Sequence, residues 1–509
     1  MTSCLPIGNG QFGATIMGGV ECDEIQFNDK TLWKGSVGSN VDNSQYGAYL
    51  NFGYLRIRQL DGHAGAYSDY IRTLDLDKAV ASVAYTANGV AYRREYLASY
   101  PDNVVAIRYT ASKKGNIRVC ISLDNVNGSQ EDVSYKNGKK RMGYAEMYGV
   151  AARMGNTKDN ESYRCGLRVV ADGGQVSAQK DGIYVDGATA MVVYLRGITN
   201  YDASNDNYLS DAANLPSRVS EVLDKAVRKG YANIRKVHIK DYESLATRCR
   251  LRLSDGGENC MPTPKLISEY AGNPSLLLLE ELYFTYGRYL LISSSRGVDL
   301  PANLQGIWNN SDKPGWNSDI HSDINVQMNY WLAEPVNLGE LHIPFLNYIH
   351  REACERSQWR KNAREIGGQS KGWTITTENN IYGSGSTWMT NYTVANAWYC
   401  QHLWQHYLYT LDKDYLRDTA YPAMKSCSEY WMERLVKADD GTYECPNEFS
   451  PEHGPAAENA TAHSQQLVWD LFRNTLRALE ILGQDAAFEK ELREKFGRLD
   501  KGLAVEEVN

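Results

Sequence analysis

The sequence predicts a multi-domain chain in which an all-β part is followed by an all-α part. The chain has 509 residues, more than one compact core usually organises. Up to about residue 214, apolar and polar residues alternate with period two, which is typical of half-buried strands. From about residue 264, the apolar residues follow the helical period instead. We therefore expect a β domain over 1–214, a helical linker over 215–263 and a helical domain over 264–509.

In the β domain, strand-like runs are separated by turn signals such as Ala-Asn-Gly at 87–89 and Asp-Gly-Gly at 172–174. Alternating strands with short turns favour two antiparallel sheets packed face to face. The clearest runs are 15–28, 79–99, 103–112, 116–123 and 190–197.

The linker begins with a helical pattern over 215–249, and a last strand is expected at 250–255. A break that contains glycine and proline follows at 256–264. The helical domain then shows long, aromatic-rich stripes, as expected for helices that pack on neighbours at both sides. These stripes cover 275–296, 391–411, 416–436, 460–482 and 485–499.

Composition excludes several classes of function. The net charge is −8 and no long lysine or arginine run occurs, so nucleic acid is not an expected partner. No run of 18 apolar residues occurs, and the first residues do not form a signal peptide. The ten cysteines lack CxxC spacing, which favours free thiols over a zinc site or a disulfide framework.

The stretch HSDINVQMNYWLAEP (321–335) predicts a helix with a polar leading edge, and it ends a long loop at 296–331. Long irregular loops in compact domains are usually functional or disordered, and the tryptophans and prolines of this loop argue against disorder. Amides, carboxylates and indoles together suit a sugar-binding cleft. The alternative is a packed loop whose amides satisfy its own backbone. The candidate residues are Asn303, Gln305, Trp308, Trp316, His321, Asp323, Asn325 and Asn329.

Two further motifs carry titratable groups. Glu448 and Glu452 lie in a proline- and glycine-containing loop, where a carboxyl with a raised pKa would serve as a general acid. The alternative is that both are solvated loop carboxylates. His402 and His406 have the i, i+4 spacing of a metal pair, but no HExxH glutamate accompanies them, so we favour core histidines and no metal.

Paired carboxylates with a sugar-type lining suggest glycoside hydrolysis, which needs no cofactor. One rival is a non-catalytic carbohydrate-binding protein, which would use the same aromatics and amides. Another is a disaccharide phosphorylase, which would need an anion site beside the acid. The expected partner of the hydrolase is an oligosaccharide or polysaccharide substrate.

Several stretches resemble glycoside hydrolase family 95, the inverting α-L-fucosidases, some of which act on α-L-galactosides. The resemblance implies an N-terminal antiparallel β-supersandwich followed by an (α/α)6 barrel, here incomplete, because about half of the twelve helices are visible. It also implies preceding and following sequence, a periplasmic or secreted location, and weak or absent activity for the isolated chain. The stretches are LPIGNGQFGATIMGG, IQFNDKTLW, GRYLLISSSRGVDLPANLQGIWN, INVQMNYWLAEPVNL, CQHLWQHY and SPEH.

By this resemblance, Glu452 of SPEH matches the general acid. The family commonly has Asn-x-Asn before QMNYW to position the attacking water, and this chain has Asp323 and Asn325 there. We hypothesise that Asp323 is itself the base, because a carboxylate accepts a proton where an amide does not. His321 is expected to contact the sugar and to influence the choice between a C5 methyl and a hydroxymethyl group. The other expected sugar contacts are Trp308, Asn303, Gln305, Trp316, Asn329, Trp398 and His402.

Overall fold

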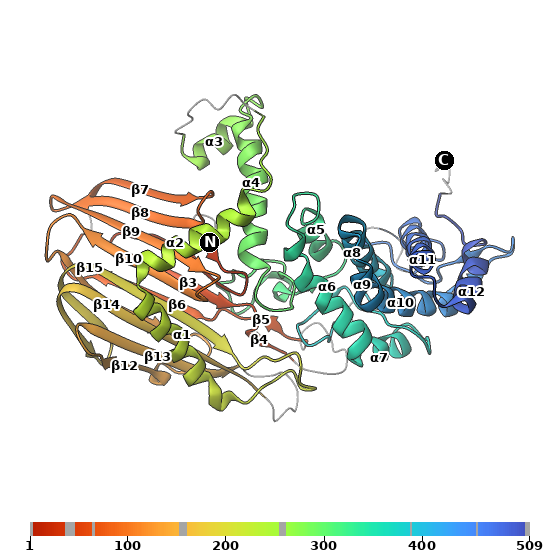
Figure 1. Ribbon diagram of the computed structural model, residues 1–509, viewed down its shortest axis with the longest axis horizontal. Helices are drawn as coiled ribbons and strands as arrows, with labels where there is room; N and C mark the ends of the chain where they lie inside the picture. Colours follow the sequence, from red (N-terminus) through yellow and green to blue (C-terminus); the bar gives the residue numbers. More distant parts are fainter. Residues whose placement is uncertain are drawn as a thin grey trace.

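The computed structural model describes residues 4–35, 46–63, 67–151, 160–253, 261–386, 389–452, 454 and 457–503. An all-β part and an all-α part lie next to each other along the longest axis of the molecule (Figure 1). The predicted fold class, an antiparallel β part followed by a helical part, is therefore confirmed.

Thirteen strands of the β domain form one connected sheet. The sheet branches at the long strand β15 (Gly182–Thr199). One edge of β15 pairs with β14, and its other edge is shared by β11 and β10. The inward faces meet in a core of Ile, Val, Leu and aromatic side chains. The other strands are β1 (Leu5–Gly8), β2 (Phe12–Ile16), β3 (Cys22–Asp29), β6 (Gly53–Gln59), β7 (Tyr67–Asp75), β8 (Val80–Ala87), β9 (Val90–Ser99), β10 (Val104–Ala111), β11 (Ile117–Asp124), β12 (Val133–Asn137), β13 (Met142–Ala151) and β14 (Glu161–Gln179).

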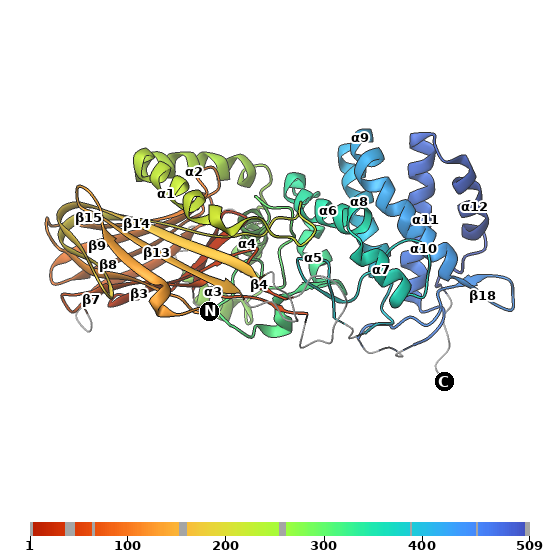
Figure 2. The same cartoon turned by 90° about the horizontal axis from the view of Figure 1, so that it is seen from below.

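Two linking helices, α1 (Leu215–Lys229) and α2 (Tyr231–Ala246), cover an outer face of the sheet (Figure 2). They bury Leu215, Val219 and Leu223 against strand residues in a second core. Gly230 separates the helices with a positive φ of 77°, a conformation that glycine adopts without strain. The strand expected at 250–255 is wrong for 250–253, which have no regular structure, and the last two positions lie outside the described residues.

Each long helical stripe predicted from the sequence corresponds to a helix. The remaining helices are short, and a π-helical turn (Arg351–Glu355) interrupts the segment of α6 and α7, so no long stripe marks it. The bounds are α3 (Thr263–Tyr270), α4 (Leu278–Ser294), α5 (Asn325–Trp331), α6 (Ile343–His350), α7 (Gln358–Glu365), α8 (Ala395–Thr410), α9 (Lys413–Tyr415), α10 (Tyr421–Arg434), α11 (Ala462–Leu482) and α12 (Ala486–Phe496). No helix of the described residues has both the length and the hydropathy of a membrane span.

The helix expected at 321–335 is shorter than predicted. It begins at Asn325, because Ile324 has a φ of 132° that no helix contains. His321 and Asp323 therefore precede the helix, and His321 lies in the short strand β16 (Ile320–His321). The predicted polar edge of that helix contained His321, Asp323, Asn325 and Asn329. The expectation that these four residues share one helical edge is thus wrong for His321 and Asp323.

The β domain contacts the loop at 296–323 directly. The indole of Trp308 donates to the carbonyl of Ile7 at 2.9 Å, and the amide of Asn309 donates to the carbonyl of Tyr49 at 2.9 Å. Gln26 and Asn28 in β3 donate to the carbonyl of Asn309 in turn. The loop is therefore built against the sheet.

Candidate active site

Two short strands form the frame of the candidate site. In β16, His321 pairs with Glu378 of β17 (Glu378–Asn379). A tight turn at Gly315–Ser318 leads into β16, with positive φ values at Trp316, Asn317 and Ser318. Because side chains alternate along an extended segment, Asp319, His321 and Asp323 share one side. We call Asp319, His321, Asp323 and Glu378 the His321 cluster.

His321 is held between two carboxylates. Its Nδ1 lies 3.1 Å from Oδ1 of Asp319, and its Nε2 lies 3.3 Å from Oδ1 of Asp323. Burial disfavours the imidazolium, but the bonds to Asp319 and Asp323 outweigh burial and raise the pKa of His321 to about 10. At neutral pH the cluster therefore contains a cation between two carboxyl groups.

Two carboxyls of the cluster, those of Asp319 and Glu378, are almost completely buried. Burial raises the pKa of Asp319 to about 6, against the opposing bond from His321. Burial also raises the pKa of Glu378, whose Oε2 has no hydrogen-bond partner within the described part of the chain. The same holds for Oγ1 of Thr377, Oδ1 of Asn379 and Nδ2 of Asn303. Buried polar atoms without partners are rare in folded proteins, and a polar ligand would satisfy them.

Asp323 also faces the helical domain. Burial raises the pKa of Tyr392, and the carboxylates of Asp323 and Glu448 raise it further. The Tyr392 hydroxyl lies 3.2 Å from Nε2 of His463. Burial lowers the pKa of His463, and the opposing effect of Asp323 is smaller. The half-buried Trp398 contacts His463 edge-on, with ring centroids 5.4 Å apart. We call Tyr392, His463 and Trp398 the aromatic wall, and Asp323 acts electrostatically on its first two members.

The predicted amides of the loop largely bind their own backbone. Oδ1 of Asn303 accepts from the backbone of Gln305 at 2.8 Å and from Ser318, while Asn329 donates to the Asn303 carbonyl at 3.3 Å. Trp308 is buried against the β domain, whereas Trp316 is 69% exposed. Loop packing thus accounts for the contacts of Asn303, Asn329 and Trp308, and their expected contacts with sugar remain predictions.

His402 lies in a different buried network. Its Nδ1 is 2.9 Å from Nε2 of His342, whose Nδ1 is 3.0 Å from Oε1 of Glu334. Nδ1 of His406 approaches the same Glu334 oxygen at 2.6 Å. Burial opposes ionisation of Glu334, but the bonds from His342 and His406 lower its pKa to about 2. This network joins the segment after α5 to α6 and α8.

Among the residues that the structure describes, two groups of side chains have the composition of a metal site. Their ligand atoms lie within 4.8 Å of one another: Glu334 with His342 and His406, and Asp319 with His321 and Glu378. Hydrogen bonds between imidazole and carboxylate account for the histidine contacts in both groups, so neither group requires an ion.

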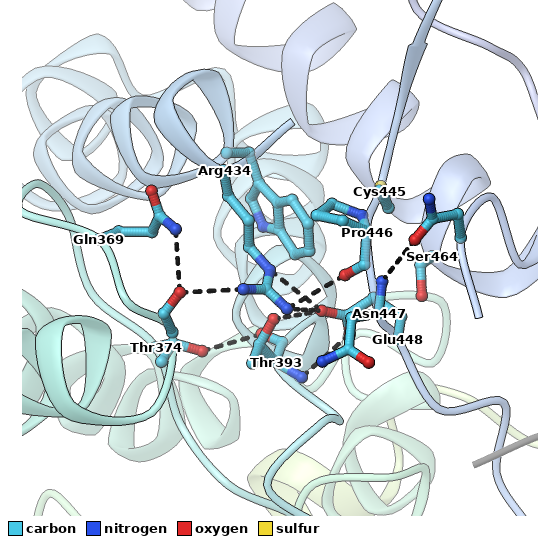
Figure 3. Close-up of polar contacts among 12 residues, drawn as sticks. Gln369, Thr374, Thr393, Arg434, Cys445, Pro446, Asn447, Glu448 and Ser464 are labelled. Atoms are coloured by element: carbon cyan, nitrogen blue, oxygen red, sulfur yellow. Dashed lines mark hydrogen bonds and ion pairs between the residues drawn. The ribbon is translucent and has the colours of Figure 1, made fainter. Parts of the chain in front are cut away.

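The two glutamates of the 445–459 loop have different surroundings. Glu448 is fully buried, and Figure 3 shows it between Arg434 and Thr393. Its Oε1 lies 3.0 Å from Nη2 of Arg434 and accepts from Oγ1 of Thr393 at 2.6 Å. Burial raises the pKa of Glu448 to about 7, against the opposing charge of Arg434. Glu452 is exposed.

Sequence reasoning singled out His321 and Asp323 but gave no role of their own to four neighbours: Asp319, Glu378, Tyr392 and His463. Asp319 had a usable signal, since Asp-x-His-x-Asp places all three side chains on one side of an extended segment. Glu378, Tyr392 and His463 lie 57 to 142 residues beyond His321 in the chain, and no local pattern connects them with His321.

Comparisons with known proteins agree with this architecture. The family model "Glycosyl hydrolase family 95 catalytic domain" matches residues 230–507, and "Glycosyl hydrolase family 65, N-terminal domain" matches 1–48 and 39–204. "Probable alpha-fucosidase A" of Aspergillus niger is 31% identical over 99% of this chain and 69% of its own length. "Alpha-L-fucosidase 2" of Arabidopsis thaliana is 30% identical over 95% of this chain and 64% of its own length.

Among solved structures, "Putative kojibiose phosphorylase from human microbiome" is similar with a TM-score of 0.66 and 10% identity. The matched region covers 97% of this chain and 67% of the chain of that structure. At 10% identity, the likeness concerns the fold alone. The chain thus spans about two thirds of the length of these proteins.

Proposed function

Because the chain belongs to glycosyl hydrolase family 95, we propose that it cleaves terminal α-L-fucosyl or α-L-galactosyl residues from glycans with inversion. The observation that carries this proposal is the His321 cluster: a cation between two carboxyl groups, surrounded by buried polar atoms without partners. Sugar hydroxyls both donate and accept hydrogen bonds, so they match such a surface.

Asp323 is the proposed base. His321 engages its Oδ1, which orients the carboxylate and leaves the other oxygen to accept a proton from water. Asn325, half-buried at the start of α5, would help to position that water. The water oxygen then bonds to the anomeric carbon while its proton passes to Asp323, and the glycosidic C–O bond breaks on the opposite face.

Glu452 is the proposed acid, which donates a proton to the departing oxygen. Its loop docks on the segment that carries Tyr392, because Phe449 donates to the carbonyl of Asn391 at 3.2 Å and Glu448 accepts from Thr393. Tyr392 has both Asp323 and Glu448 as electrostatic neighbours. The loop of Glu452 and the segment of Asp323 therefore border a common aromatic wall.

The experiment compares two leaving groups. We expect Glu452→Gln to slow release of fucose from a glycan by about 10²–10⁴-fold, because the departing hydroxyl is basic and needs the proton. The rate on an aryl α-L-fucoside, whose leaving group is an acidic phenol, should fall much less. Glu458→Gln, exposed in the same loop, should retain wild-type rates for both substrates.

The stereochemistry is read by proton NMR, where β-L-fucose should form first from an α-L-fucoside. A first product of α configuration would contradict inversion, and equal losses on both substrates would contradict Glu452 as the acid. Binding of a fucose-like iminosugar without any turnover, measured by calorimetry, would instead favour a non-catalytic carbohydrate-binding protein. The weak activity expected of the 509-residue chain and its periplasmic or secreted location stay predictions.

A further inference from the structure

A residue of the β domain reaches the His321 cluster. Tyr46 is fully buried and lies shortly before β5 (Ala48–Tyr49). Its hydroxyl donates to Oδ2 of Asp319 at 3.2 Å, and its carbonyl accepts from Nδ2 of Asn380 at 2.9 Å. Asp319 precedes β16 and Asn380 follows β17, so one residue of the β domain is bonded to both segments of the site frame.

We propose that Tyr46 is a positioning residue of the active site, which fixes Asp319 so that Asp319 and Asp323 together hold His321. The inference rests on the proposed function, because it assigns a role within that same site. It makes the β domain a contributor to the catalytic apparatus, through one hydroxyl group.

The charges around Asp319 determine what that hydroxyl does. His321 faces Asp319 from β16, Glu378 from β17, and Tyr399 from α8. Burial and the carboxyl of Glu378 favour the protonated form of Asp319, whereas His321 and Tyr46 favour the carboxylate. Loss of the Tyr46 hydroxyl should therefore let Asp319 take up a proton at a higher pH. His321 would then lose one of its two anionic partners.

Tyr49 offers a matched control. It is also fully buried and lies in β5, three residues after Tyr46, but its hydroxyl donates to the backbone carbonyl of Ile307 at 2.8 Å. Tyr46→Phe and Tyr49→Phe each remove one buried hydroxyl that donates from the β domain to the loop at 296–323. Tyr46→Phe alone of this pair removes a partner of the cluster.

The first test is the pH profile of kcat/KM for an aryl α-L-fucoside. We expect the acid limb of Tyr46→Phe to move up by about one pH unit, so that kcat/KM at pH 5 falls about tenfold while the value at pH 8 changes little. Tyr49→Phe should keep the wild-type limb. A Tyr46→Phe profile that superposes on the wild-type profile would overturn the proposal.

The second test does not need turnover, so it separates this inference from the proposed function. In ¹⁵N-histidine NMR, the His321 Nδ1 resonance, assigned with His321→Asn, should show an inflection near pH 6 as Asp319 titrates. Tyr46→Phe should move that inflection up. Replacement of Tyr46 by 3-fluorotyrosine, a stronger hydrogen-bond donor of nearly equal size, should move the inflection to a lower pH. This replacement also provides a test if Tyr46→Phe does not fold. An inflection that neither replacement moves would reject the role of Tyr46 even if fucose is released.

Discussion

Asp323 illustrates how one residue type changes what a position does. A neutral asparagine orients water, whereas a carboxylate held by the His321 cation also accepts a proton. The bond to His321 fixes the carboxylate, and the buried surroundings strengthen that charge-assisted contact. If Asp323 is the base, as we propose, the difference between Asp and Asn at this position is a difference in reaction chemistry.

If Asp323 is the base, removal of its side chain leaves space for a small anion. We expect Asp323→Ala to hydrolyse an aryl α-L-fucoside at least 10²-fold more slowly. Azide should restore part of the rate and yield β-L-fucosyl azide, because azide attacks without deprotonation. Asp312→Ala, exposed in the same loop, serves as the control. Wild-type rates in Asp323→Asn, or no azide product from Asp323→Ala, would contradict the assignment.

The residues of the site were predictable where the signal was local. His321 and Asp323 stood out because polar residues interrupted an apolar pattern, and Asp319 followed the same alternation. The carboxyl of Glu378 and the ring of Tyr392 come from segments that tertiary packing brings to β16. His402 and His406 lie buried in a network with His342 and Glu334, in agreement with the expectation of core histidines, and the expected contact of His402 with sugar stays a prediction.

At the scale of elements, α10 and the loop of Glu452 are joined by the buried pair of Arg434 and Glu448. Arg434 also donates to the carbonyls of Gly367 at 2.9 Å and Pro446 at 3.2 Å, so its guanidinium holds three segments together. Glu448 and Glu458 exchange backbone hydrogen bonds at 2.9 and 3.1 Å across the base of that loop. The loop of the proposed acid is thus anchored by a buried ion pair.

Loss of the guanidinium would leave Glu448 buried without its cation. We expect Arg434→Met to lower the free energy of unfolding by about 3–5 kcal/mol, measured by urea titration at pH 8. The double variant Arg434→Met/Glu448→Gln should recover part of that loss, since it removes the uncompensated charge as well. A double variant less stable than the single variant would show that the charge of Glu448 is not the cause.

Long elements were readable from the sequence, and short ones were not. The stripe at 460–482 corresponds to α11 within two residues, because 21 helical residues repeat the period many times. In contrast, α5 has seven residues, and tertiary contacts in β16 and β17 decide where it begins. The segment of α6 and α7 gave no long stripe either, because both helices are short and a π-helical turn lies between them.

At the scale of the molecule, the contact between the β domain and the helical domain contains a buried lysine. Lys30 is 1% exposed, and its Nζ donates to the carbonyl of Leu300 at 3.1 Å. Burial lowers its pKa to about 7, against the opposing charges of Asp29 and Asp299. The two domains are therefore held together by a contact whose strength changes with pH.

Lys30 has a lower pKa in the folded chain than the ordinary value of 10.5, so the unfolded chain binds more protons between pH 7 and 10.5. This group's contribution to stability is fully present above pH 10.5 and is lost as the pH falls toward 7. We expect the unfolding free energy of the wild type, relative to that of Lys30→Met, to rise from pH 7 to pH 9.5. Lys236→Met, exposed on α2, should show no such pH-dependent difference from the wild type. Parallel curves for Lys30→Met and the wild type would contradict a lowered pKa of Lys30 in the folded chain.

The position of β15 in the chain has a consequence for biosynthesis. Residues up to Asp124 leave the ribosome with the edges of β10 and β11 unpaired, because both strands pair with β15. The start of β15 follows roughly 60 residues later, which at about 5–20 residues per second is a delay of roughly 3–12 s. During that interval the nascent sheet is open in the middle, and open strand edges recruit other chains. Occupancy by a chaperone is therefore expected to peak before residue 199 emerges, and ribosome profiling of chaperone-bound nascent chains would locate that peak.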